Sequence, residues 1–540
     1  MEKQAAKRRE DDGSSSMDRI SNLPQPILHH ILSFSLPKEA IQTCVLSKSW
    51  RYLGSTRPNV EFIQYYFNGI EQKFMSIVNK TLQRYHDQKL CMQEFRVEML
   101  SVGDSESISL LEKWIPIVVL NMGVKRFSLY FHSKISPCFD LFSVVFESES
   151  LKDLDLQRCK LSPNPLNKVP FKYLEALSLI RVYIAEETFE KIMSNCPLIN
   201  NLVLVDCEGL KTIKLNKHNS LNYFEFCYHM EYLYRAENDH LSIEIDVPTL
   251  KTLTILWCPK WLHHHNYFPN LISLSLNMVQ LSSKSFDSFS CNFPCLEHLS
   301  ISYCDDFEEF QLSSRSIKHF TIVSESRSSI KAVIDAPNIV QFDYQCDVLP
   351  SISFTTTSSE WKSNITYNLD IDRPSSSWFL NLYQLLKALS QSEISLDFLP
   401  TIYGEEPDQA LVVADNSIYG SLHKPAVVVE YLTLSFYSSS TISAFMNDLF
   451  RICRPRYIGP YWYTNARDEL VELLYNILIK ERRKRHYLWQ QDLEEVTAEA
   501  FNENGQEWHP VHWTSLLEGD ALLPNNQCKQ KFRIRLKWTN

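Results

Sequence analysis

The chain has 540 residues and a formal net charge of −10, from 54 Lys and Arg against 64 Asp and Glu. Apolar residues make up 44% of the sequence, which is enough to build a packed core. The acidic balance argues against a broad surface for nucleic acid or membranes, and no apolar run reaches the roughly 20 residues of a membrane helix. With 11 Gly and no nucleotide-binding, nucleophile or metal motif, we expect no enzyme and no cofactor.

Residues 1–17 are expected to form a disordered, charged tail, because they contain no apolar stretch that could pack. They also lack the apolar segment of a signal peptide. We therefore expect a protein of the nucleus, the cytoplasm or both, whose 14 Cys are reduced thiols. Lys7-Arg8-Arg9 fits either half of a nuclear import signal or a solubilising tail.

Residues 18–60 are expected to form a compact module of three short helices. Asn22 and Pro24 suit the start of the first helix, and Ser47 can cap the third, over 48–53. The first helix carries two apolar stripes, which are Ile27, Ile31 and Phe34 on one side and Leu28 and Leu32 beside them. A module of about 40 residues needs only one stripe for its own core. We predict that the second stripe, with Leu23 and Trp50, is surplus and faces a partner protein or the next domain.

Three short runs stand close together in this module, at 18–24, 31–34 and 45–53. Together they resemble an F-box. The resemblance implies a trihelical domain that docks on a Skp-type adaptor in a cullin ubiquitin ligase. By this match, the adaptor would be contacted by Leu23, Pro24, Ile27, Leu28, Ile31, Leu32, Leu46 and Trp50. Gly54 is a departure, since plant relatives often have Trp there.

After a helical linker or cap expected over 61–91, the sequence repeats itself through residue 450. The repeat is apolar-x-x-apolar-x-apolar, and its mean period of about 24 residues lies in the leucine-rich-repeat range. The repeats begin at Met92, Val124, Leu151, Leu174, Ile199, Leu221, Leu250, Leu271, Leu296, Ile317 and Ile339. Weaker ones stand near Ile365, Gln391 and Val429. One strand plus a return segment cannot bury its own apolar face, so stacked repeats should form a curved solenoid with a parallel strand face.

Several cysteines follow the strand positions of the repeats at a fixed distance. Cys159, Cys207, Cys258 and Cys304 each lie three residues after the last strand apolar residue. A small side chain there can bond to the backbone of the turn, and the pattern resembles the cysteine-containing repeats of F-box proteins. We expect buried structural thiols rather than metal ligands. We also expect a solvated loop at His263-His264-His265 and no metal site.

The repeat register predicts which residues face the concave side of the solenoid. In the repeats from Leu151 to Ile339 these positions include four acids and no Lys or Arg. Such a face suits a peptide or protein, including a basic one, and suits neither DNA nor a polyphosphate. The predicted substrate-binding residues are Glu225, His298, Ser300, Ser302, His319, Thr321, Gln341, Asp343 and Gln345.

Residues 451–540 change character. An amphipathic helix is expected over 468–489, and the strict alternation over 532–538 is typical of a half-buried strand. The basic run over 480–486 fits a helix C-terminus or a nuclear signal. This region resembles the C-terminal extension of plant F-box solenoid proteins, and we expect an α+β cap on the last repeat.

These expectations describe an α/β chain with an F-box, a leucine-rich-repeat solenoid and a C-terminal cap. Its favoured function is substrate recognition in an SCF-type cullin ubiquitin ligase. The expected partners are a Skp-type adaptor, the cullin complex and an unknown protein substrate, without nucleic acid or membrane. Two alternatives stay open, which are a hormone-like small-molecule receptor of the same architecture and a scaffold that never meets the ligase.

Overall fold

The computed structural model describes residues 20, 23–34, 42–67, 70–100, 105–132, 139–141, 145, 147–161, 173–216, 218–228, 242–257, 267–281, 286, 288–304, 308–325, 329–356, 358, 360–369, 375–400, 425–434, 439–462, 468–480, 489–502, 506–517 and 531–539. The chain divides into two compact units, Met1–Leu210 and Lys211–Asn540, which we call the N-terminal and the C-terminal unit. The predicted tail over 1–17, the predicted cap Asn22 and much of the predicted second helix lie outside the described residues.

The N-terminal unit opens with short helices. α1 (Gln25–Ser33) starts directly after Pro24, whose fixed φ suits the entry to a helix. A short 3-10 turn, η1 (Thr43–Val45), and α3 (Lys48–Ser55) follow. The Ser47 hydroxyl accepts a hydrogen bond from the Trp50 backbone N–H at 3.2 Å, which satisfies one free donor at the start of α3. The predicted cap of the third helix is therefore confirmed.

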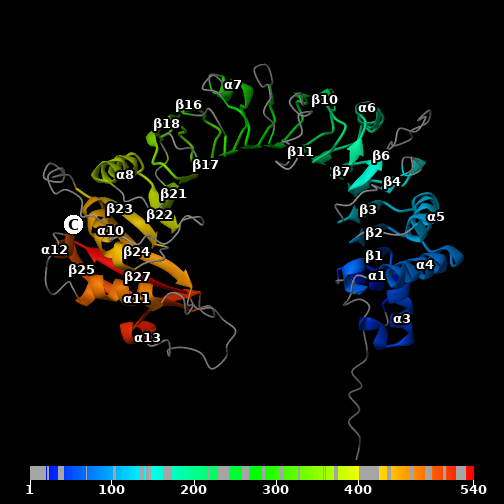
Figure 1. Ribbon diagram of the computed structural model, residues 1–540, viewed down its shortest axis with the longest axis horizontal. Helices are drawn as coiled ribbons and strands as arrows, with labels where there is room; N and C mark the ends of the chain where they lie inside the picture. Colours follow the sequence, from blue (N-terminus) through cyan, green and yellow to red (C-terminus); the bar gives the residue numbers. More distant parts are fainter. Residues whose placement is uncertain are drawn as a thin grey trace, which may run out of the picture. The chain divides into compact units, whose positions relative to one another are not determined.

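A parallel sheet fills the rest of the N-terminal unit, with helices on one side of it (Figure 1). Its strands are β1 (Asn59–Ile63), β2 (Glu94–Met99), β3 (Arg126–Phe131), β5 (Asp153–Gln157), β7 (Ala176–Ile180) and β9 (Asn201–Val205). Its return segments include η2 (Gln64–Phe67), α4 (Glu71–Asp87), α5 (Ser105–Asn121) and α6 (Glu186–Asn195). Three shorter strands, β4 (Phe139–Leu141), β6 (Cys159–Leu161) and β8 (Tyr183–Ile184), pair in a second ladder.

The first strand of this sheet corrects the predicted boundary of the repeats. The span 61–91, expected to be a helical linker or cap, does contain α4, but β1 before it pairs with β2 in register, Val60 opposite Phe95 and Phe62 opposite Val97. Val60 and Phe62 are each 6% exposed, so they extend the apolar core of the repeats. The strand escaped the sequence pattern because Arg57 stands where a repeat would place its leading apolar residue. The repeats therefore begin before residue 92.

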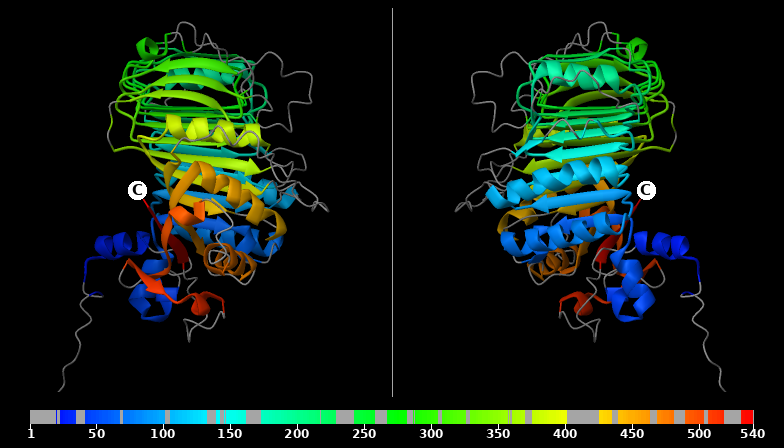
Figure 2. Two further views of the ribbon diagram at one scale, coloured as in Figure 1. Left: turned by 90° about the vertical axis from the view of Figure 1, so that its left-hand side faces the viewer. Right: turned by 90° about the vertical axis from the view of Figure 1, so that its right-hand side faces the viewer.

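The C-terminal unit continues with the same kind of parallel sheet (Figure 2). Its strands are β11 (Tyr223–Cys227), β13 (Thr252–Leu256), β14 (Ser273–Asn277), β15 (His298–Ser302), β17 (His319–Ser324), β19 (Gln341–Cys346), β21 (Lys362–Leu369), β22 (Glu393–Pro400), β23 (Val427–Leu434) and β24 (Cys453–Trp462). The weaker repeats at Gln391 and Val429 coincide with β22 and β23, whereas Ile365 lies within β21 opposite Tyr344, the last apolar position of its repeat, and so does not begin one. Because β24 also pairs parallel, the ladder runs past the predicted boundary at residue 450.

Return segments of the C-terminal unit alternate between short strands and helices. The short parallel strands are β10 (Thr212–Asn216) with β12 (Ser242–Asp246), and β16 (Glu309–Ser313), β18 (Lys331–Asp335) and β20 (Ser351–Thr355). The helices are α7 (Phe289–Asn292), α8 (Ser376–Ala388) and α10 (Ser439–Ile452). Among the residues described in both units, no helix is long and apolar enough to cross a membrane.

The apolar core follows the predicted repeat pattern. In each of the eleven repeats from Met92 to Ile339, all three apolar positions are at most 3% exposed. Burying one Leu or Phe side chain in this way contributes about 1.5–3 kcal/mol relative to exposure. Each repeat contributes one layer of such residues, so neighbouring repeats close each other's core. The predicted repeat register is confirmed.

A left-handed turn residue follows many of the strands. These residues are Arg158, Arg181, Asp206, Trp257, Met278 and Tyr303, with φ between 51° and 61°. This backbone conformation costs a residue other than Gly roughly 1–2 kcal/mol. The turn offsets part of that cost by a hydrogen bond to the next strand. For example, the Arg158 N–H donates to the Ile180 carbonyl, and the Met278 N–H to the Ser302 carbonyl, both at 2.9 Å.

Among the described residues, a cysteine directly follows three of these turn residues, at Cys159, Cys207 and Cys304. The Cys207 thiol donates to the Leu179 carbonyl at 3.3 Å, and the Cys304 thiol to the Ser302 carbonyl at 3.4 Å. Burial raises the pKa of Cys207 to about 12, so its thiol stays protonated at neutral pH. The prediction of buried thiols is confirmed for Cys159 and Cys207, whereas Cys304 is only half-buried. Cys258 and His263-His264-His265 lie outside the described residues.

The chain ends in an antiparallel continuation of the sheet. β24 pairs with β27 (Lys531–Trp538), β27 with β25 (Leu493–Asn502), and β25 with β26 (Glu507–Val511). Phe532, Ile534 and Leu536 are buried, which confirms the predicted half-buried last strand. The Arg533 guanidinium lies over the rings of Tyr457 at 3.9 Å and Trp508 at 4.3 Å, and its Nε is 2.7 Å from Glu499 Oε2.

The helix predicted over 468–489 is a shorter element. α11 (Asp468–Tyr475) runs into a π-turn, η7 (Asn476–Lys480), and α12 (Trp489–Asp492) begins separately, ahead of β25. Val471, Leu474, Ile477 and Leu478 are buried. The basic run after Lys480 lies outside the described residues. A last short helix, α13 (Trp513–Leu517), follows β26.

Replacing Leu253 with Ala should destabilise the C-terminal unit by about 2–5 kcal/mol, because the side chain is fully buried in β13 and leaves a cavity. Since repeats contact mainly their neighbours, hydrogen exchange should rise first in β11 and β14, the partners of β13. Thr254→Ala, on the other face of the same strand, is the matched control. Faster exchange confined to β27 would contradict this register.

Replacing Arg533 with Gln should cost about 3–5 kcal/mol, because it removes the closer and more buried of the two cations beside the buried Glu499 carboxylate and leaves only Arg535 at 3.9 Å. Arg535→Gln, on the same strand with a 59% exposed side chain, should cost less than about 1 kcal/mol. Urea unfolding followed by Trp fluorescence, with both variants compared to wild type, measures the difference. Equal effects of the two variants would mean that the Arg533–Glu499 pair does not stabilise the cap.

Candidate functional site

The core of the helical module is formed by one side of α1 and by α3. Leu28 and Leu32 are 2% exposed, Trp50 is 8% and Leu53 is 0% exposed, and Leu23 packs against this cluster. The prediction that Leu28, Leu32 and Trp50 are surplus to the internal core is therefore wrong. Two apolar stripes stand side by side on α1, and the sequence alone did not indicate which of them turns toward α3.

The other stripe of α1 is exposed. Ile27 is 47% exposed, Ile31 39% and Phe34 79%, and these three residues follow one another at helical spacing on one side of α1. Val45 at 83% and Leu46 at 67% form a second exposed apolar segment beside η1. Pro24, at the start of α1, is exposed as well. Exposed apolar groups gathered on so small a module are typical of a protein-binding surface.

The C-terminal unit brings the predicted substrate-binding residues onto one face of its sheet. We call this the open face, because its side chains are half-buried or exposed while the alternate residues are buried. His298, His319 and Gln341 are direct partners on adjacent strands, and so are Ser300, Thr321 and Asp343. Ser302 and Gln345 each pair with Val323. Glu225 lies in line with Ser300 but is separated from it by Thr254 and Ser275.

Neutral side chains hold the Asp343 carboxylate in place. The Gln341 amide donates to both of its oxygens, at 3.0 and 2.9 Å, and Asn364 donates to Oδ1 at 2.6 Å. The Thr321 hydroxyl donates at 3.5 Å. Beside this group, the His298 and His319 rings stack with centroids 4.7 Å apart and planes 14° apart. The arrangement fixes an anionic group on the open face, and no described Lys or Arg lies within ion-pair distance of it.

Glu225 is held in a comparable way. It accepts a hydrogen bond from the Tyr223 hydroxyl at 2.6 Å. Burial and this hydrogen bond raise the pKa of Tyr223 to about 12, so the phenol remains a donor at neutral pH. Both carboxylates therefore have fixed positions on the open face.

The same line of residues continues further than the sequence pattern indicated. Asp343 pairs with Asn364, Asn364 with Ser395, and Ser395 with Tyr431. The Tyr431 ring stacks on that of Tyr457, with centroids 5.3 Å apart. These aromatic residues were missed because alternation breaks in β23, where Glu430 and Tyr431 are consecutive half-buried residues.

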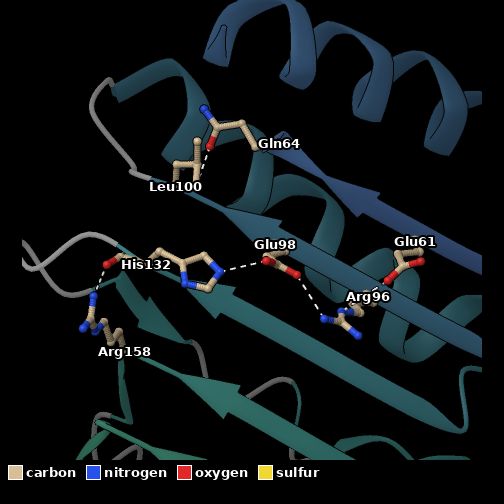
Figure 3. Close-up of polar contacts among 7 residues, drawn as sticks. All are labelled: Glu61, Gln64, Arg96, Glu98, Leu100, His132 and Arg158. Atoms are coloured by element: carbon tan, nitrogen blue, oxygen red, sulfur yellow. Dashed lines mark hydrogen bonds and ion pairs between the residues drawn. The ribbon is translucent and has the colours of Figure 1, made fainter. Parts of the chain in front are cut away.

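A second polar network, on the N-terminal unit, was missed by sequence reasoning (Figure 3). Arg96 lies 3.4 Å from Glu61 and 3.0 Å from Glu98, and Glu98 lies 2.8 Å from His132. The Arg158 guanidinium donates to the His132 carbonyl. The network went unnoticed because Glu61 belongs to β1, the strand that the repeat pattern omitted. The network as a whole links β1, β2 and the end of β3 by charges that largely neutralise one another.

Within the described ranges, no group of three or more His, Cys, Asp or Glu is arranged to hold a metal ion. The candidate site thus consists of two surfaces. One is the exposed apolar side of α1 with Val45 and Leu46, and the other is the open face of the C-terminal unit. The first is suited to binding another molecule through apolar contact, and the second through hydrogen bonds and charge.

Comparison with known protein families agrees with both parts of this arrangement. Residues 20–60 match the F-box domain, and residues 111–256 and 231–357 match the family described as FBD-associated F-box protein At5g56370, LRR repeats. F-box/LRR-repeat protein 25 of Arabidopsis thaliana is 35% identical over 214 residues, 39% of this chain and 76% of that protein.

Two further Arabidopsis thaliana proteins are similar over a smaller share of their own length. F-box protein At5g03100 is 31% identical over 209 residues, 39% of this chain and 63% of that protein. Putative F-box protein At1g49610 is 30% identical over 283 residues, 51% of this chain and 64% of that protein. With an F-box followed by matching leucine-rich repeats, the chain belongs to the F-box/LRR-repeat proteins.

Proposed function

We propose that this protein is the substrate-recognition subunit of an SCF-type cullin ubiquitin ligase. F-box/LRR-repeat proteins in general act as substrate adaptors of this ligase, and F-box domains generally bind its Skp-type adaptor. In this proposal the helical module binds the adaptor, and the repeats bind the protein to be ubiquitinated. The chain holds an acceptor lysine near the conjugating enzyme and contributes positioning, while other subunits carry the thioester chemistry.

The observation that carries the proposal is the exposed apolar side of the helical module. Its own core is already closed by Leu28, Leu32, Trp50 and Leu53. Five further apolar side chains are therefore not needed to complete that core, and each of them is 39% exposed or more. They are Ile27, Ile31, Phe34, Val45 and Leu46. Removing apolar area of this kind from water contributes about 25 cal/mol per Å², from which the entropic cost of association is subtracted.

The revised adaptor surface differs from the sequence prediction in part. Pro24, Ile27, Ile31 and Leu46 remain in it, and Phe34 and Val45 join it. Leu28, Leu32 and Trp50 support it from inside the module, as does the half-buried Leu23. Substitutions in the two groups should therefore act differently, one on binding and the other on folding.

Ile31→Glu combined with Leu46→Glu should weaken adaptor binding at least about 30-fold, as truncation of interface anchors does, because a charge then faces the apolar partner. The melting temperature of the full-length chain should stay within about 2 °C of wild type, since both side chains are exposed. Co-purification with a Skp-type adaptor and titration of the purified proteins measure the effect.

Two control variants separate binding from folding. Lys73→Glu introduces the same charge on the exposed side of α4, outside the module, and should leave adaptor binding unchanged. Leu28→Ala should destabilise the module by about 2–5 kcal/mol and raise hydrogen exchange in α1 and α3. Wild-type adaptor binding by the Ile31→Glu, Leu46→Glu variant would refute the proposed adaptor surface.

A further inference from the structure

A row of short side chains crosses the open face of the C-terminal unit. Each member is the direct ladder partner of the next, one per strand from β13 to β22. The members are Thr254, Ser275, Ser300, Thr321, Asp343, Asn364 and Ser395. We call them the middle row. At roughly 4.8 Å per strand, the row spans about 29 Å, which an extended peptide covers with about nine residues.

Larger side chains stand only at the two ends of this row. Glu225 precedes it on β11, in line with Thr254, and the stacked rings of Tyr431 and Tyr457 follow it. The side chains between them have two to four heavy atoms beyond Cα and are half-buried. A partner's main chain can therefore approach the sheet closely along the middle row.

The chemistry of the middle row favours an extended partner. Its hydroxyl and amide groups repeat at strand spacing and can pair with backbone N–H and C=O groups. An extended segment carries such unpaired groups along its whole length, whereas a helix has already satisfied its own. Side-chain hydrogen bonds of this kind fix the position of the bound segment on the sheet, while they leave its amino-acid sequence mostly free.

Charge on the open face is divided between the sheet margin and the middle of the strands. At the margin, Glu297 pairs with Lys318 at 2.8 Å, and Glu393 with Lys362 at 3.7 Å. In contrast, Asp343 is hydrogen bonded by amides and a hydroxyl. Among the residues that the structure describes, neither Asp343 nor Glu225 has a Lys or Arg within ion-pair distance. Their negative charges are held in place and remain available to a partner.

From these observations we propose that the open face binds an extended segment of about nine residues that carries a Lys or Arg side chain on Asp343. This inference rests on the proposed function and names the chemistry of the substrate segment. The segment crosses the strands from β13 to β22, and its backbone pairs with the middle row. Tyr431 and Tyr457 bound its far end. A cation can form a charge-assisted hydrogen bond with Asp343 at Oδ2, where the contact from the Thr321 hydroxyl is long, at 3.5 Å.

The test uses the full-length protein bound to its Skp-type adaptor and pools of nine-residue peptides. Each pool fixes Arg, Lys, Glu or phosphoserine at one position and varies the others. Fluorescence polarisation should show Arg and Lys pools binding at least about 10-fold more tightly than Glu pools when the fixed position is central. Raising the salt concentration should weaken that preference, as expected for an exposed charge pair.

Variants locate the preference on the sheet. Asp343→Asn keeps the size and an acceptor oxygen but removes the charge, and it should reduce the preference at least fivefold. Glu393→Gln removes a carboxylate that is ion-paired two strands away, and it should keep the preference. Thr321→Trp places a bulky ring in the middle row and should block every pool. Gln311→Trp, on the exposed side of β16, is its matched control.

The outcomes separate this inference from the proposed function. Equal binding of Arg and Glu pools, tighter binding of phosphoserine pools, or no binding by any pool would overturn it. A preference that persists in Asp343→Asn, or binding that persists in Thr321→Trp, would also overturn it. Because every measurement is made on the adaptor complex, these results leave the F-box assignment standing. Loss of the adaptor complex itself in the wild-type chain would refute the proposed function instead.

Discussion

Residue-for-residue register between parallel strands is the constraint on which both sheets depend. Phe224, Leu253 and Leu274 lie opposite one another, so their side chains share one apolar layer. Because side chains alternate along a strand, a shift by one residue would turn that layer to solvent and bury its polar neighbours. The polar rows of the open face follow from the same register. Residues far apart in the sequence come into line there because the core on the other side fixes every strand.

Where a pattern repeats, the sequence determined the fold in detail. Eleven copies of one apolar spacing identified strands, their buried residues and the outward residues between them. The same regularity placed His298 beside His319, and Thr321 beside Asp343, before any coordinates. Local chemistry sufficed at Ser47, whose hydroxyl caps α3, and at Cys207, whose thiol bonds to the turn.

Prediction failed where a choice depended on a tertiary partner. Both stripes of α1 are apolar, and only packing against α3 decides that Leu28 rather than Ile27 turns inward. β1 lacks the leading apolar residue of a repeat, so Glu61 and its contact with Arg96 went unnoticed. The stacking of Tyr431 on Tyr457 and the pairing of Arg533 with Glu499 each bring two different segments together. No local sequence spacing predicts such contacts.

The left-handed residues at the ends of the strands have a consequence for how the protein tolerates length changes. Five of these six turn residues donate their N–H to the end of the next strand, as Met278 does to Ser302, and so tie the repeats together at the strand end. Return segments differ between repeats, from a short strand such as β16 to a helix such as α8. A short epitope inserted into a return segment would therefore lengthen a loop while the polar rows keep their order. Insertion of a single residue within β17 would instead displace Thr321 from Asp343.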